Sequence, residues 1–193
     1  MGHIETIQRA FPHSYEFDYI DETPSAIKQR YYYPGASTDA GRDGILVEVR
    51  PANGCPWFGT FAFGHLSSKG ASGIFTTPDP QRLCVVARGA GYFVSADRPT
   101  IWEPVLTTPI IDVRPIPAQD IIVFANYTEL VAYGHKGIKW ATSRLAWDSL
   151  HITEVTDRII RGRFWDLRSE ALATFVVDLA TGESQGGIED NPS

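Results

Sequence analysis

The sequence contains few of the residues from which metal sites and catalytic centres are commonly built. Its 193 residues include two cysteines and five histidines, and neither type occurs at the short spacings typical of metal ligands. No Gly-x-Ser-x-Gly motif indicates a serine hydrolase. We therefore expect no metal and no cofactor, and no catalytic residue can be assigned from a local motif.

Positive charge and long apolar runs are also scarce. The chain has 17 Lys and Arg against 23 Asp and Glu, which gives a formal net charge of −6. Binding to nucleic acid or to an anionic membrane needs clustered positive charge, so we expect neither partner. No apolar run is long enough to span a membrane, and the first ten residues lack the features of a signal peptide. We expect a cytoplasmic protein.

The two cysteines lie in different sequence contexts. Cys84 belongs to the apolar run 83–86, which predicts a buried core residue. Cys55 lies in the turn-like segment 54–57, which reads Gly-Cys-Pro-Trp. The sequence leaves open whether the two thiols are free or paired.

Glycine, proline and aromatic residues are abundant, and together they favour strands joined by turns. The chain has 17 Gly, 13 Pro and 12% aromatic residues. Residues 15–19 alternate aromatic and acidic side chains, which predicts a strand, and residues 23–29 could open a short helix. From residue 44 onward no helix is predicted, and strand candidates follow at the spacing typical of all-β domains. The candidates are 45–49, 57–63, 73–76, 83–87, 91–95, 101–106, 110–114, 121–125, 129–133, 138–142, 150–155, 159–165 and 173–179.

Some of these apolar runs recur at a fixed interval. Runs begin at Ile45, Leu83, Ile121 and Ile159, so each starts 38 residues after the one before it. A period of this size predicts a repeated β unit that buries its apolar face against its neighbours. We therefore predict an all-β fold, a small propeller-like antiparallel meander. The alternative is a β-sandwich whose strand spacing imitates a repeat.

Two segments resemble the repeats of quinoprotein-like (PQQ-type) β-propellers. Residues 121–142, IIVFANYTELVAYGHKGIKWAT, contain a strand, a turn, a second strand and then Gly and Trp. Residues 175–183, FVVDLATGE, contain a turn similar to the Asp-x-x-Thr-Gly turn of those repeats. The resemblance implies a blade-type β-meander. It does not carry over the quinone or calcium site, because no ligands for either can be placed here.

The pattern divides the chain into three parts. Residues 1–43 form an irregular N-terminal segment expected to pack on the main domain, residues 44–187 form the all-β domain, and residues 188–193 form a flexible tail. An array of this length has room for four or five blades, the lower end of the propeller range. The N-terminal segment would have to complete the first blade, or a homodimer would close the array.

The segment 159–166 is the best candidate for a binding site. Side chains alternate along a strand, so Arg161, Arg163 and Trp165 should share one face. Two guanidinium groups beside an indole could hold a carboxylate, a phosphate or a planar anion. The alternative is a solvent-facing edge strand protected by charge. A second, weaker cluster is formed by Arg144, Trp147 and Asp148.

These observations favour a non-enzymatic function. We expect a binding or protein-interaction module whose partner is a protein or a small molecule, with a small anion as one candidate ligand. The alternative is an enzyme that acts on a small anionic metabolite and takes its residues from loops at one end of the β array. A purely structural or oligomeric role is a third interpretation.

Overall fold

The computed structural model describes residues 6–22, 29–38, 41, 43–65 and 70–188. The chain divides into two compact units, unit 1 up to Ile110 and unit 2 from Ile111. The boundary expected at residue 44 thus falls inside unit 1. Within the described ranges, a single 3-10 turn at Pro117–Gln119 is the only helical element, so the all-β prediction is confirmed. The helix expected over 23–29 lies almost wholly outside the described residues.

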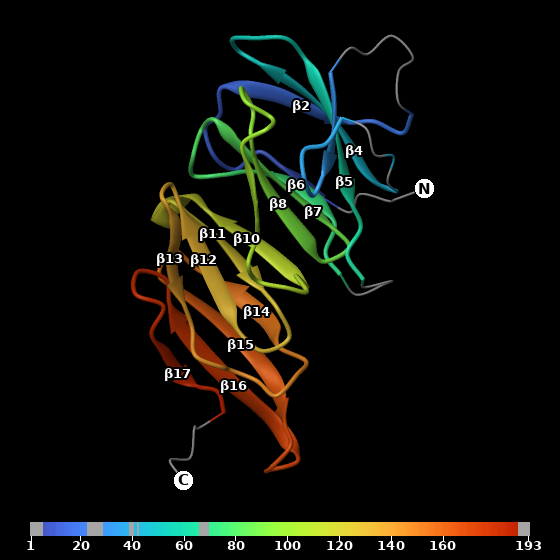
Figure 1. Ribbon diagram of the computed structural model, residues 1–193. Coiled ribbons are helices and arrows are strands. Elements are labelled where there is room, and N and C mark those ends of the chain that lie inside the picture. The colour runs from blue at the N-terminus through green and yellow to red at the C-terminus, as the bar shows by residue number, and fades with distance from the viewer. Residues whose placement is uncertain (1–5, 23–28, 39–40, 42, 66–69, 189–193) are drawn as a thin grey trace. The chain divides into compact units, whose positions relative to one another are not determined.

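Unit 1 contains two sheets, which we call sheet A and sheet B (Figure 1). Sheet A has the order β1-β6-β7-β8-β9 and sheet B the order β2-β4-β5-β3. The pairs β1–β6 and β3–β5 are parallel, and the others are antiparallel. The strands are β1 (Thr6–Gln8), β2 (Tyr15–Tyr19), β3 (Arg30–Tyr33), β4 (Gly44–Pro51), β5 (Trp57–Ala62), β6 (Gly73–Thr76), β7 (Arg82–Ala87), β8 (Ala90–Ser95) and β9 (Trp102–Pro104).

Unit 2 contains sheet C and sheet D, coloured yellow to red in Figure 1. Each is a four-stranded antiparallel meander in which every strand pairs with the next strand of the chain. Sheet C consists of β10 (Asp112–Ile116), β11 (Ile121–Ala125), β12 (Leu130–Gly134) and β13 (Gly137–Ala141). Sheet D consists of β14 (His151–Val155), β15 (Ile159–Asp166), β16 (Ala171–Asp178) and β17 (Ser184–Gly186).

Every strand candidate from residue 44 onward overlaps an observed strand. The strands β7, β11 and β15 begin at or next to three of the expected positions, and each is the second strand of a four-strand meander. The run at Ile45 lies in β4 of sheet B, whose strand order is different. The 38-residue interval therefore does not describe all four sheets, and none of the sheets is closed.

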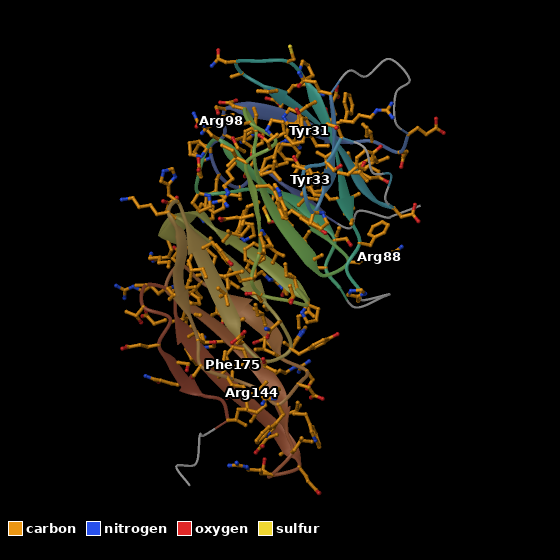
Figure 2. All side chains as sticks on the ribbon, in the orientation of Figure 1. Tyr31, Tyr33, Arg88, Arg98, Arg144 and Phe175 are labelled. Carbon is orange, nitrogen blue, oxygen red and sulfur yellow. The ribbon has the colours of Figure 1, made fainter. Side chains whose placement is uncertain are left out.

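The two sheets of unit 1 share one core that is rich in aromatic side chains. The ring of Tyr33, which Figure 2 labels, stacks on Phe61 with 4.7 Å between centroids. Its hydroxyl donates a hydrogen bond of 2.6 Å to the Pro99 carbonyl oxygen. The indole nitrogen of Trp57 donates to the Ala96 carbonyl oxygen at 2.7 Å. These bonds satisfy the polar atoms of large buried rings, which would otherwise destabilise the core.

The two sheets of unit 2 also share one core. Trp140 of β13 is buried, and its indole nitrogen donates to the Leu179 carbonyl oxygen at 2.8 Å. Gly182 lies against the same ring, where an added Cβ would approach Trp140 to 2.7 Å, and its φ of +77° favours glycine. In each unit the apolar faces of two sheets form a single core.

Two other sequence-based interpretations can be compared with the structure. Cys84 is fully buried and Cys55 is exposed, and both thiols are free. The tail expected at 188–193 is described only at Ile188. Among the described residues, no helix is long and apolar enough to cross a membrane.

Candidate interaction face on sheet D

The alternation expected along β15 is present. Arg161, Arg163 and Trp165 are exposed on one face, whereas Ile160 and Phe164 are buried on the other. A face of this kind arises because successive side chains of a strand point to opposite sides of the sheet. The three predicted residues are therefore brought together on the outer face of sheet D.

Arg161 is already paired on this face. It lies opposite Glu154 of β14 and Val176 of β16, and its guanidinium contacts the Glu154 carboxylate at 2.6 Å. About half of each charged side chain is exposed, 52% and 49%. Exposed pairs of this kind contribute little to stability, so Arg161 can exchange its partner at small cost.

Arg163 is the second cation of this face. It lies between His151 of β14 and Thr174 of β16 and is exposed. Within the part of the chain that the structure describes, its guanidinium makes no hydrogen bond or ion pair. Its five N–H donors are therefore available to a carboxylate from outside the chain.

Apolar side chains extend the same face towards the β15–β16 turn. Trp165 lies directly opposite Leu172 of β16, and the two are 45% and 62% exposed. Leu167, in the turn itself, is 61% exposed. We call Arg161, Arg163, Trp165, Leu167 and Leu172 the sheet D patch. The sequence argument missed the two leucines, although pairing 159–165 with 173–179 as a hairpin would have placed Leu172 near Trp165.

The turn that carries Leu167 is held by Asp166. Its carboxylate accepts a hydrogen bond of 2.6 Å from the Ser169 hydroxyl and one of 3.1 Å from the Arg168 backbone nitrogen. These bonds favour the ionised form and lower the pKa of Asp166. The negative charge thus fixes the turn, and with it the apolar end of the sheet D patch.

The second predicted cluster is only partly assembled. The guanidinium groups of Arg144 and Arg168 each lie 5.4 Å from the ring centroid of Trp147. Arg144 also donates to the backbone carbonyl oxygens of Ala146 and Trp147, at 3.1 and 2.8 Å (Figure 2 labels Arg144). Asp148 is exposed and makes no ion pair with any described residue. Because Arg144 donates its hydrogen bonds to the backbone of its own loop, we interpret this cluster as stabilising that loop rather than as a binding site.

Three surface cavities lie elsewhere, and each mixes charges of both signs. One of about 350 Å³ is lined in part by Asp21, Asp43 and Arg88, and another of about 240 Å³ in part by Arg82 and Glu103, which form an ion pair. In the first, burial and a hydrogen bond with Asp21 raise the pKa of Tyr19. The third, of about 290 Å³, is lined by Phe164, Asp166, Arg168, Ala173, Gly187 and Ile188. None of these three includes Arg161, Arg163 or Trp165.

The described residues contain no group of three or more His, Cys, Asp or Glu side chains placed to hold a metal ion. The comparisons with known proteins give no further guidance: no family model, no curated protein and no solved structure matches this chain.

Proposed function

We propose that this protein is a non-enzymatic protein-interaction module that binds its partner through the sheet D patch. The observation that carries the proposal is the exposure of Trp165 and Leu172 side by side, next to the guanidinium of Arg163, which pairs with none of the described residues. Tryptophan and arginine dominate the binding energy of many protein interfaces, and here a regular strand fixes the backbone that carries both.

A protein partner fits this face better than a small anion. The patch lies on an open sheet surface, and the three cavities described above are lined by other residues. A small anion needs several converging donors in a concave site, whereas here one guanidinium is paired and the other is exposed.

The architecture and the location of the protein belong to the same proposal. We propose that β6–β9, β10–β13 and β14–β17 are three copies of one blade-like unit, supported by their equal strand order. An experimental structure that relates the three sheets by one repeated rotation would support this, and sheets related only in pairs would favour sandwiches.

The free, exposed thiol of Cys55 is suited to a reducing compartment, so we propose a cytoplasmic location.

Site-specific photocrosslinking in cells tests the binding face. A photoreactive residue replaces Trp165 in one variant and Lys136, in the exposed β12–β13 turn, in a matched control. We expect a discrete protein adduct from position 165 that is lost when Arg161→Glu and Arg163→Glu are added, and no such adduct from position 136. Equal labelling from both positions, or no adduct at either, would overturn the proposed face.

A further inference from the structure

The largest of the three cavities described above belongs to unit 1 and lies at one end of sheet B. It forms where β2 and β5 end and β4 begins, together with the β7–β8 turn of sheet A. Its volume of about 350 Å³ falls within the range of small-molecule sites, about 300–1,000 Å³, whereas the other two, of about 240 and 290 Å³, fall below it. The lining residues are Tyr19, Ile20, Asp21, Asp43, Gly44, Leu46, Phe63 and Arg88.

Arg88 has a backbone conformation that is unfavourable for arginine. Arg88 and Gly89 form the two-residue turn between β7 and β8, with φ values of +46° and +84°. Such turns favour asparagine or glycine, because most other side chains clash in the left-handed region. Residues held in such conformations are concentrated at functional sites. An arginine at this position therefore points to a role for its side chain.

The surrounding structure fixes the backbone of this turn. The N–H of Arg88 donates a hydrogen bond of 3.1 Å to Oγ of Ser72. Gly64 and Gly70 approach the turn so closely that a Cβ on either would lie 2.5 Å from a backbone atom of Arg88. The position from which the Arg88 side chain extends is thus set by its neighbours.

The guanidinium of Arg88 is placed at the cavity without an acidic partner. It lies over the ring of Phe63, 4.1 Å from the ring centroid (Figure 2 labels Arg88). Among the residues that the structure describes, it accepts no ion pair and makes no hydrogen bond, although Asp21 and Asp43 line the same cavity. A contact with a ring face leaves the in-plane N–H donors of a guanidinium available to a ligand.

The rest of the cavity is formed by carboxylates and apolar side chains. Asp21 interacts with the Tyr19 hydroxyl through a hydrogen bond, which orients its carboxylate, and Asp43 is exposed. Asp43 forms no ion pair with any described residue. Leu46 and Ile20 are half-buried and add an apolar surface beside these charges.

We propose that this cavity binds an amino acid with an apolar side chain, with the ligand carboxylate on Arg88 and the ligand ammonium on Asp21 and Asp43. A simple anion would be repelled by the two carboxylates of the cavity, and a simple cation by its guanidinium. A zwitterion is attracted by both, and its side chain can pack on Phe63 and Leu46. The site lies outside the sheet D patch, so this inference does not depend on the proposed function.

Amide NMR spectroscopy of the purified full-length protein tests the ligand class, with L-leucine and L-phenylalanine as probes. We expect saturable shifts of the Arg88 and Gly89 amide signals, with a dissociation constant between about 0.1 and 10 mM. Isocaproate, which is leucine without its ammonium group, and isoamylamine, which is leucine without its carboxylate, should each bind at least about tenfold more weakly. Equal binding of either analogue, or no saturable shift with either amino acid, would overturn the proposal.

Arg88→Asn separates a role in binding from a role in stability. Asparagine is favoured in the left-handed turn, so the melting temperature should stay the same or rise, whereas leucine binding should weaken at least about tenfold. A lower melting temperature with unchanged binding would show that Arg88 serves only the fold, and would overturn the site.

Asp43→Asn and Arg98→Asn complete the test. Asp43→Asn should weaken the binding of leucine but not that of isocaproate, which has no ammonium group to lose a partner. Arg98→Asn is the matched control, because Arg98 is an exposed arginine of unit 1 that does not line this cavity (Figure 2 labels Arg98). It should leave leucine binding unchanged, and a loss equal to that of Arg88→Asn would contradict a specific site.

Discussion

Trp57 and Trp140 make the same hydrogen bond in the two units. Each indole nitrogen donates to a backbone carbonyl oxygen 39 residues later, Ala96 at 2.7 Å and Leu179 at 2.8 Å. Each acceptor directly follows the third strand of the meander in the next sheet, β8 or β16. The two sheets of each unit are therefore linked by the same type of hydrogen bond, from an indole nitrogen to a backbone carbonyl oxygen, although sheets B and C differ in strand order.

Removing either indole nitrogen should destabilise its unit by a similar amount. Trp140→Phe and Trp57→Phe keep an aromatic ring but leave a buried carbonyl oxygen without its donor, which costs about 1–3 kcal/mol. Urea unfolding followed by circular dichroism measures the loss. Trp165→Phe, at a side chain 45% exposed, should change stability by much less. An equal loss in all three variants would show that the hydrogen bonds are not the cause.

Gly162→Ala should destabilise unit 2 because the Phe175 ring occupies the space next to Gly162. A Cβ at this position would lie 2.0 Å from Cζ of Phe175 and 2.7 Å from the His151 carbonyl oxygen (Figure 2 labels Phe175). Overpacking of this kind costs about 1–3 kcal/mol, measurable as a lower urea midpoint. Gly134→Ala, whose Cβ would meet only the Asp120 carbonyl oxygen at 3.6 Å, is the control.

A second substitution separates overpacking from loss of backbone freedom. Phe175→Leu removes the ring atoms that block the Cβ, so Gly162→Ala should cost less in that background than in the wild type. The two unfolding free energies give the coupling directly. If the costs are equal, the ring is not the obstacle.

The stability of the protein should fall at alkaline pH, in part because of Cys84. Burial raises the pKa of this thiol above its ordinary value of 9.0. The thiol stays neutral in the folded chain but ionises in the unfolded one. The contribution of Cys84 to the free energy of unfolding is therefore intact below pH 9 and is lost as the pH rises. At pH 10 ionisation favours unfolding by about 1.4 kcal/mol.

Cys84→Ala tests this contribution by unfolding at pH 7 and pH 10. The variant should lose less stability than the wild type between the two pH values, whatever its cost at pH 7. Cys55→Ala, at an exposed thiol, should follow the wild type. Burial also raises the pKa values of Tyr15 and Tyr33, so part of the alkaline loss should remain in every variant.

The β15–β16 turn should weaken at acid pH. The hydrogen bond from Ser169 lowers the pKa of Asp166 below its ordinary value of 3.8. The ionised carboxylate therefore stabilises the folded turn above pH 3.8, and this stabilisation disappears as the carboxylate is protonated at lower pH. Ser169→Ala should therefore lower the melting temperature at pH 6 and have a smaller effect at pH 2. A difference that does not depend on pH would contradict a role for the charged carboxylate.

The short apolar runs and the alternation of side chains along them were sufficient to predict most strands and the outward face of β15. Both depend on side chains near each other in the sequence. The pairing of β1 with β6 and of β3 with β5 could not be predicted in this way. Parallel strands are not linked by a short turn that the sequence would reveal, and tertiary packing brings them side by side. The same reason explains why Leu172 was missed: its position beside Trp165 depends on the register of two strands, not on the pattern of either.

The strand order also has a consequence for how quickly each half of the chain can fold. In unit 2 every strand pairs with its neighbour in sequence, so little chain entropy is lost before contacts form. Unit 1 must bring Thr6 beside Gly73, across several intervening strands. We infer that the C-terminal half, although synthesised last, reaches its native state first, and that the N-terminal strands complete the other half in the slow step.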